Sequence, residues 1–221
     1  MLDRTFFTHT TSGSDKYLLQ IEKWMDGGGL SFGLEFPKVI RKLYPDRVFN
    51  HCLDWCSGAG TIGFEILSNK ICNHLTLMDT NGEVLRAAKN ICKSNNIEHK
   101  VKLLPASSCV FLPKHFQYDL VVANPPHFED IGQMSLVNGK LMSITPDFKR
   151  RAEDKGWKIH EDFFNNIKSR LTSDGVILLQ ENVDGSSVNT FSNMIVKNGL
   201  KVIDNFVLDI PLIYYIVIAH E

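Results

Sequence analysis

The sequence has no long hydrophobic run and no excess of charge of either sign. Its apolar runs, such as 176–179 and 210–218, are short or interrupted, and none approaches the roughly 18 residues that a membrane-spanning helix needs. Lys and Arg number 24 against 25 Asp and Glu, so the formal net charge is −1. A domain that holds nucleic acid by itself usually carries a basic balance or stripe. The balance therefore argues against a non-specific nucleic-acid binder, while it permits a local basic patch.

Cysteines are few and are not arranged for metal binding. Five are present, and no two of them form a Cys-x-x-Cys pair. Cys52 and Cys56 are four residues apart, but no second pair follows to complete a tetrahedral zinc site. The pattern predicts buried, reduced thiols that pack as small apolar side chains, and no metal site.

Residues 1–14 are polar and lack the apolar segment of a signal peptide. Together with the lack of a membrane segment, this predicts a cytoplasmic protein that has no membrane partner. The aromatic content of 10% is too ordinary to mark an interface, so the oligomeric state is left open.

From residue 51 onward, apolar runs alternate with segments of helical period. Seven strands are expected, at 51–55, 75–78, 101–104, 118–123, 176–179, 201–208 and 214–219. Such alternation is typical of a parallel sheet covered by helices. The short turn around Pro211 makes the last two strands an antiparallel pair. The predicted fold is therefore α/β, a three-layer doubly wound sheet of seven mostly parallel strands with one antiparallel strand near the C-terminus.

The chain of 221 residues is long enough for one large domain or two small ones. Apolar residues at helical spacing over 39–43 predict a helical lead-in over residues 1–48, followed by the α/β domain over 49–221. Thr80 and Glu83 have the spacing of a capping box at the start of a helix. The polar stretch 129–157 has no clean period.

The first candidate site follows the first strand of the α/β domain. Gly58, Gly60 and Gly63 lie between that strand and a helix, where glycine lets the backbone approach a ligand near free helix amides. Asp79 ends the next strand and would lie at the same edge of the sheet, where its carboxylate can accept hydrogen bonds from ribose hydroxyls. The glycine spacing alone also fits a nicotinamide-dependent oxidoreductase or a tight turn without a ligand.

The second candidate site is the segment Asn124-Pro125-Pro126-His127, which follows a buried strand. Two prolines remove two backbone donors and make a rigid corner, and Pro125 excludes Asn124 from the helical region. The amide oxygen of Asn124 and the carbonyl of Pro125 can both accept hydrogen bonds. Two such acceptors can hold the hydrogens of an amine on a planar group, so that its lone pair faces an electrophile.

These motifs, in this order, resemble class I S-adenosylmethionine-dependent methyltransferases, in particular the amino-methylating group with an Asn-Pro-Pro-aromatic motif. The resemblance covers about residues 32–221. It implies that S-adenosyl-L-methionine is the cofactor and that the acceptor is an exocyclic amine of a nucleobase or the side-chain amide of a protein glutamine.

The resemblance also implies a role for each matching residue. The residues that it assigns to the cofactor are Asp54, Cys56, Gly58, Gly60, Asp79, Ser107 (or Ser108) and Asn124. Those that it assigns to catalysis at the acceptor are Asn124, Pro125, Pro126 and His127. Those that would contact the substrate are His127, Phe128 and Glu181, the last because it ends the fifth strand on the ligand side. The Gly27–Gly29 run, Phe32 and Phe36 could fold over the cofactor as a lid or simply pack a lead-in helix.

Three positions depart from the pattern. Cys56 stands where the first glycine of the loop is usual, and Ala106-Ser107 replaces a frequent acidic residue near the adenine. His127 replaces the usual aromatic residue, so either His127 or Phe128 would stack on the acceptor. His127 could also be a general base.

Charged residues follow the second motif directly. Six are basic and three acidic: Lys140, Lys149, Arg150, Arg151, Lys155, Lys158, Asp147, Glu153 and Asp154. They could form a substrate lid that contacts phosphates, or a solvated loop. Trp157 could stack on a substrate or anchor the next helix.

The sequence thus predicts an N-methyltransferase that acts on a nucleic-acid base, chiefly in RNA. A protein glutamine or amine, a small molecule, and a non-catalytic methyltransferase-like binding protein are the alternatives.

Overall fold

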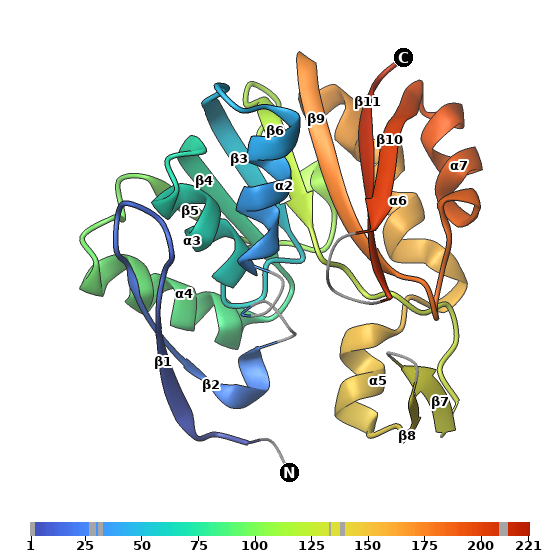
Figure 1. Cartoon of the computed structure of the whole chain (residues 1–221), viewed down its shortest axis with the longest axis horizontal. Helices are drawn as coiled ribbons and strands as arrows, with labels where there is room; N and C mark the ends of the chain where they lie inside the picture. The colour runs from blue at the N-terminus through green and yellow to red at the C-terminus, as the bar shows by residue number, and fades with distance from the viewer. Residues whose placement is uncertain (1–2, 27–29, 31–32, 133, 138–139, 208–211) are drawn as a thin grey trace. The chain divides into compact units, whose positions relative to one another are not determined.

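The computed structural model describes residues 3–26, 30, 33–132, 134–137, 140–207 and 212–221 (Figure 1). Seven strands form one sheet in the order β10-β11-β9-β6-β3-β4-β5. Strands β3, β4 and β5 pair in parallel, and β11 is antiparallel to both β9 and β10. This confirms the predicted α/β class, including the single antiparallel strand near the C-terminus.

The chain divides into two compact units, which we describe separately. Unit 1 comprises residues 1–107 and 118–122, and unit 2 comprises 108–117 and 123–221. In unit 1, the strands β3 (Phe49–Trp55), β4 (Cys72–Asp79) and β5 (Val101–Pro105) alternate with the helices α3 (Thr61–Ser68) and α4 (Gly82–Ser94). Strand β6 (Tyr118–Ala123) ends at the boundary between the units. The predicted strands all lie within observed ones, except that residue 208 of the sixth falls outside the described residues.

The N-terminal segment contains a β-hairpin, so the predicted helical lead-in is wrong for its first part. Strands β1 (Phe6–Thr10) and β2 (Leu18–Glu22) pair antiparallel, and β2 alternates buried Leu19 and Ile21 with exposed neighbours. That period of two places one apolar face on the core, which a helix of these residues would not do. The short helix η1 (Lys23–Met25) follows, and α2 (Glu35–Leu43) coincides with the predicted helical spacing. The Gly27–Gly29 run and Phe32 lie outside the described residues.

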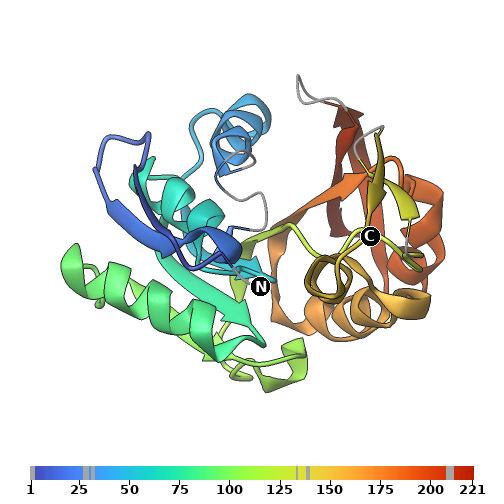
Figure 2. The same cartoon turned by 90° about the horizontal axis from the view of Figure 1, so that it is seen from below.

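Figures 1 and 2 show the hairpin beside α4. The side chain of Asn95 joins them, since it accepts a hydrogen bond from the Leu18 amide and donates one to the Leu18 carbonyl. The start of α4 corrects a second prediction. Its cap is Asn81, whose side chain accepts from the Glu83 amide at 2.9 Å, and not Thr80.

The hairpin turn is fastened to the end of α3. The buried carboxylate of Glu65 accepts hydrogen bonds from the amide and the hydroxyl of Ser12 at 2.9 and 2.7 Å, and its other oxygen lies 2.8 Å from Nε2 of His9. Gly13 lies so close to α3 that a Cβ there would be 2.2 Å from the carbonyl carbon of Ser68. The hairpin is therefore an integral part of unit 1.

This contact gives a stability prediction. Gly13→Ala should lower the free energy of unfolding by about 1–3 kcal/mol, because the added methyl meets backbone that cannot rotate away. Gly82→Ala is the matched control, since a Cβ there meets only the end of the Arg86 side chain, at 3.8 Å. It should change stability by less than about 0.5 kcal/mol. Urea unfolding compares them, and equal stabilities of the two variants would contradict the packing argument.

In unit 2, β9 (Leu171–Asn182), β10 (Leu200–Val207) and β11 (Ile213–His220) lie beside α6 (Lys158–Ile167) and α7 (Val188–Lys197). Helix α7 follows the turn after β9, and Ser187 caps it. Pro211, which we expected in the last turn, lies outside the described residues.

The segment 129–157 has more regular structure than its pattern predicts. It holds the hairpin β7 (Met134–Val137) and β8 (Lys140–Ser143), which Figure 1 shows beside α5 (Pro146–Ala152). Thr145 caps α5 and Pro146 occupies its first turn. Three short 3₁₀ helices complete the unit: η2 (Cys109–Phe111), η3 (Lys155–Trp157) and η4 (Lys168–Arg170). Among the described residues, no helix combines the length and the apolar character that crossing a membrane requires.

Candidate active site

The glycine turn of unit 1 has the backbone shape that requires its glycines. Between β3 and α3, Cys56, Gly58 and Gly60 have φ of 59°, 55° and 85°, the left-handed region that glycine adopts at little cost. A Cβ on Gly60 would lie 2.5 Å from Leu77, so this glycine lets the turn pack on β4. Among the described residues, a Cβ on Gly58 would meet only the carbonyl oxygen of Met25, at 3.8 Å. The described part of the chain thus leaves space beside Gly58.

Asp79 joins this turn to the next one. At the end of β4, one of its carboxylate oxygens accepts a hydrogen bond from the Gly58 amide and the other from the Asn81 amide, both at 2.8 Å. An ionised carboxylate has about four acceptor positions, so each oxygen retains capacity for a ligand hydroxyl. The ribose role of Asp79 remains a prediction, and this geometry supports it.

Asp54 is fully buried beneath the turn. Its Oδ2 accepts from the Gly63 amide at 2.9 Å, while Oδ1 is buried without a hydrogen-bond partner. Burial raises the pKa of Asp54 to about 8, and nearby Asp79 adds to the effect although the Gly63 amide opposes it. Within the described part of the chain, Oδ1 of Asp54 is thus a buried acceptor without a partner, and the contact of Asp54 with a cofactor stays a prediction.

The other predicted cofactor residues have less distinctive surroundings. Cys56 is half-buried in the turn, and Ser107 is exposed after β5. Ser108 is buried and caps η2, because its Oγ accepts from the Val110 amide at 3.2 Å. Of the two serines, Ser107 therefore has the more accessible side chain. No disulfide joins the five cysteines, all of which are described; four of them are buried, as predicted, and Cys56 is half-buried.

In unit 2, the corner after β6 contains an unsatisfied acceptor. The amide oxygen Oδ1 of Asn124 is buried and has no hydrogen-bond partner among the described residues. Such an atom is costly unless a ligand or water satisfies it. Pro125 is buried and Pro126 is half-buried, so the corner is packed as well as rigid.

His127 is connected to a chain of buried ionisable groups. Its Nδ1 lies 3.1 Å from Oε2 of Glu181, and Oε1 of Glu181 lies 2.9 Å from Nε2 of His160. Nδ1 of His160 lies 2.7 Å from Asp154, which also accepts from the amides of Ile159 and His160 at the start of α6. Glu181, His160 and Asp154 are almost inaccessible to solvent. The structure thus brings predicted His127 and Glu181 together.

Charge alternates along this chain. Burial alone would lower the pKa of His160, but Glu181 and Asp154 outweigh it and raise that pKa to about 9. Burial would likewise raise the pKa of Glu181, but His160 and His127 outweigh it and lower that pKa. The pKa of Asp154 is lowered as well, by His160 and two backbone amides. At neutral pH, a buried imidazolium therefore lies between two carboxylates.

Sequence reasoning missed His160 as a site residue and placed Asp154 in a charged loop. Ser186 and Tyr214 were missed too; the Ser186 hydroxyl donates to Glu181 at 3.2 Å and lies 2.9 Å from the hydroxyl of Tyr214. No local signal distinguishes these residues, because they come from four separate segments of the chain.

The remaining predicted residues are buried. Phe128 packs in a cluster with Ile131, Phe148 and others, whereas the side chain of His127 is partly accessible; which ring faces the acceptor stays a prediction. Trp157 is buried and packs edge-on against His160 and Phe191, which favours the anchoring role.

The basic residues of α5 are paired within their own segment. Arg150 and Arg151 both contact Asp147, at 2.7 and 2.9 Å, and Lys149 contacts Glu153 at 2.8 Å. These pairs favour the solvated surface over a phosphate-binding lid.

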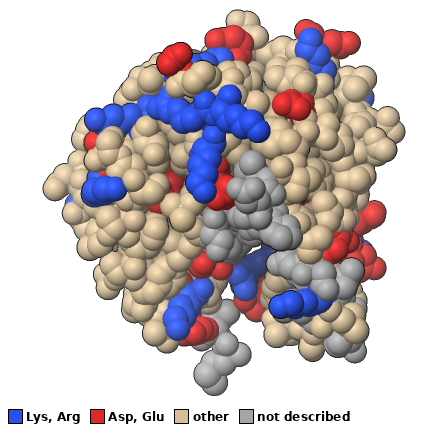
Figure 3. All heavy atoms as spheres, in the orientation of Figure 1, with Lys and Arg blue, Asp and Glu red and all other residues tan. Residues whose placement is uncertain are grey.

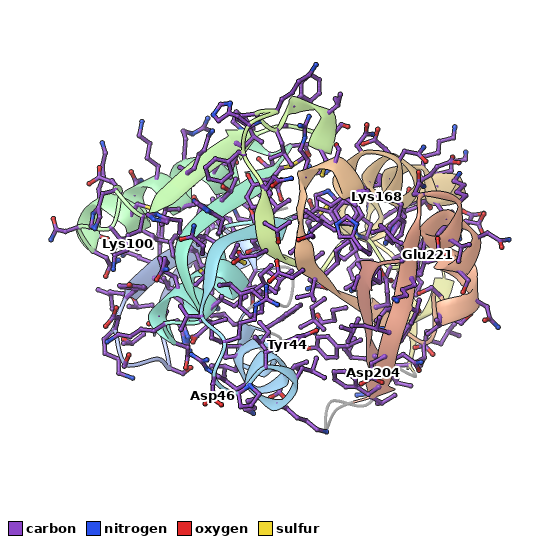
Figure 4. The ribbon with its side chains drawn as sticks, turned by 90° about the horizontal axis from the view of Figure 1, so that it is seen from above. Tyr44, Asp46, Lys100, Lys168, Asp204 and Glu221 are labelled. Carbon is purple, nitrogen blue, oxygen red and sulfur yellow. The ribbon has the colours of Figure 1, made fainter. Side chains whose placement is uncertain are left out.

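A cavity of about 580 Å³ lies at the opposite end of β9 from Glu181. Its lining is mostly polar and includes Lys168 (labelled in Figure 4), Asn165 and His220. It contains none of the predicted site residues, so we do not assign it to the reaction.

The fold and these residues define the class of protein: a class I S-adenosylmethionine-dependent methyltransferase. Residues 38–148 match the family described as "Methyltransferase small domain", and the chain belongs to this family. S-adenosylmethionine is therefore its cofactor.

Individual relatives agree with this class. The chain is 35% identical over 99 residues to the release factor glutamine methyltransferase of Leptospira interrogans, over 42% of this chain and 34% of the relative. It thus spans about a third of that curated protein's length. Among solved structures, the putative methyltransferase yhhF from Escherichia coli has a TM-score of 0.62 at 14% identity and covers 97% of this chain and 99% of its own. TrmN from Thermus thermophilus has a TM-score of 0.56 at 18% identity over 83% and 48%.

Proposed function

We propose that this enzyme transfers a methyl group from S-adenosylmethionine to an amine on a planar group, most favourably an exocyclic amine of an RNA or DNA base. The observation that carries this is the buried, unpartnered Oδ1 of Asn124 at the Asn-Pro-Pro corner. An amine hydrogen satisfies this acceptor, and the Pro125 carbonyl would accept the second hydrogen. The amine lone pair is then free of competing contacts and can be aimed at the methyl group.

The bound cofactor supplies an electrophilic methyl group on a sulfonium. The chain's own contribution is positioning. In unit 1, Asp79 and the amides of the glycine turn would hold the ribose and the methionine part. Asp54 and Cys56 are near this turn in the sequence, and Ser107 follows β5. In unit 2, Asn124, Pro125 and Pro126 would orient the acceptor, with His127 and Glu181 beside it in the chain of groups described above.

A nucleic-acid acceptor needs a local basic surface, because the net charge is only −1. Lys and Arg side chains gather over unit 1 in Figure 3. The last turn of α2 contributes Arg41 and Lys42 to this unit. That gathering supports a polyanionic substrate.

The side-chain amide of a protein glutamine is the second candidate. The Leptospira relative, at 35% identity, carries this substrate in its name. The amide of glutamine is also a planar NH₂ with a delocalised lone pair, so the same two acceptors would hold it.

Asn124→Ala tests the proposal. Turnover should fall at least about tenfold, which is about 1.4 kcal/mol of transition-state stabilisation, while the affinity for S-adenosylhomocysteine stays nearly unchanged. The assay uses extracts of cells that lack the gene, labelled methyl donor and purified protein, with RNA, protein and small molecules counted separately. Asn165→Ala, at an exposed position of α6, is the matched control.

The labelled fraction identifies the acceptor class. Label in RNA or DNA supports the first candidate and label in protein the second. Label only in small molecules, or wild-type turnover by Asn124→Ala, would contradict the proposal.

A further inference from the structure

The function proposed above gives no chemical step to the buried chain of ionisable groups in unit 2. Glu181 is the central group, because its two oxygens contact two different histidines and it also accepts from Ser186. Its side chain is 0% exposed, whereas that of His127 is 14% exposed. Burying a carboxylate is costly unless its partners are close and fixed. The contact between Glu181 and the partly accessible imidazole of His127 therefore requires the energetically costly burial of a carboxylate.

The contact selects one tautomer of His127. An ionised carboxylate only accepts hydrogen bonds, and the low pKa of Glu181 keeps it ionised. Nδ1 of His127 must then carry the hydrogen that faces Glu181. In the neutral ring, the other nitrogen, Nε2, is left as an acceptor.

The groups behind Glu181 hold it in place. His160 donates to Oε1, and Asp154 in turn accepts from His160. His160 also stacks on Phe191 with ring centroids 4.6 Å apart, and Trp157 packs against His160 in an edge-on arrangement. When His127 is neutral, the charges of Glu181, His160 and Asp154 sum to −1. A positive charge on His127 brings the sum over the four groups to zero.

The backbone of His127 is fixed as well. The turn after β9 lies so close that a Cβ on Gly185 would be 2.1 Å from the His127 carbonyl oxygen. Ring and backbone are therefore both held from the end of β9.

Resting on the function proposed above, we propose that His127 is the base that accepts the proton released by the methylated amine, and that Glu181, His160 and Asp154 are positioning residues that keep its Nε2 free to do so. As the amine nitrogen bonds to the methyl carbon, the carbon–sulfur bond breaks and its electron pair stays on the now neutral sulfur. The cationic nitrogen then gives one proton to Nε2. The resulting imidazolium faces the negative charge of Glu181.

Three described ionisable groups lie around His127 in this step. Glu181 faces His127 directly; Tyr214, by way of the Ser186 hydroxyl, and His160 act through Glu181.

Glu181→Gln is the first test. It keeps the size of the side chain but removes the charge that favours imidazolium. We expect kcat to fall about tenfold or more and KM to change less than about twofold. Glu161→Gln is the control, because Glu161 is an exposed carboxylate of α6 paired with Lys197. It should leave both kcat and KM unchanged.

His127→Phe separates a base from a stacking surface, since it keeps a flat ring without a proton acceptor. A loss of about tenfold or more in kcat is expected. Wild-type kcat in His127→Phe or in Glu181→Gln would overturn the proposal while leaving N-methylation intact.

A nuclear magnetic resonance measurement on the unliganded enzyme is independent of activity. Nitrogen shifts of the histidine rings should show the Nδ1–H tautomer for His127 in the wild type, and a changed tautomer population in Glu181→Gln. An Nε2–H tautomer in the wild type would overturn the proposal, even if no substrate had been found.

Discussion

Asp79→Ala should weaken the binding of S-adenosylhomocysteine at least about 100-fold, which is about 2.7 kcal/mol. The reason is that one carboxylate has two functions. It fastens the Gly58 and Asn81 amides at 2.8 Å each, and it would accept the ribose hydroxyls. Its loss therefore removes a ligand contact and loosens the two turns that surround the ligand. Calorimetric titration of the purified variant measures the effect.

The control for this experiment is Glu83→Gln on α4. Glu83 is a nearby carboxylate with a 43% exposed side chain that contacts Arg4 and Arg86. Its affinity for S-adenosylhomocysteine should stay within about twofold of the wild type, since screened surface pairs contribute little. An Asp79→Ala protein that is folded and binds the ligand like the wild type would refute the role assigned to Asp79.

His160→Gln should lower the free energy of unfolding by about 3 kcal/mol near pH 6. The pKa of His160 rises from 6.5 to about 9 on folding because Glu181 and Asp154 face it, and each unit of pKa shift is about 1.4 kcal/mol. Glutamine preserves polar contacts but leaves the two buried carboxylates without a cation. Urea unfolding at several pH values measures the difference from the wild type.

The sign of the pH dependence follows from linkage. The folded pKa of His160 is raised, so its contribution is fully present below pH 6.5 and is lost as pH rises through about 9. The gap between wild type and His160→Gln should therefore shrink toward pH 10. His115→Gln, at an exposed position, should show no gap at any pH. A constant gap would mean that His160 stabilises the protein by packing alone.

The sequence by itself determined the α/β sheet and the places of its strands. Buried strands leave continuous apolar runs such as 118–123, and short connections enforce antiparallel pairing, so both features are local. It also located the glycine turn, Asp79 and the Asn-Pro-Pro corner, because turns that bind ligands need special backbone conformations that only a few residue types adopt. The cap of α4 was misplaced by one residue, since Thr80 and Asn81 are both good caps.

Only the tertiary structure decided the rest. Strand β2 has only 5 residues, so its alternation of buried and exposed side chains is too short to predict a strand where the lead-in was predicted to be helical. The chain Asp154–His160–Glu181–His127 joins residues up to 54 positions apart, and none of them carries a pattern that names its partner. Burial cannot be read from a short stretch of sequence. The sequence placed Asp154 in a charged loop, whereas the structure buries it against the imidazolium of His160. Burial also leaves Oδ1 of Asn124 without a partner among the described residues. Long-range packing sets the electrostatics of such a site, because the local dielectric and the neighbouring charges are properties of the folded chain.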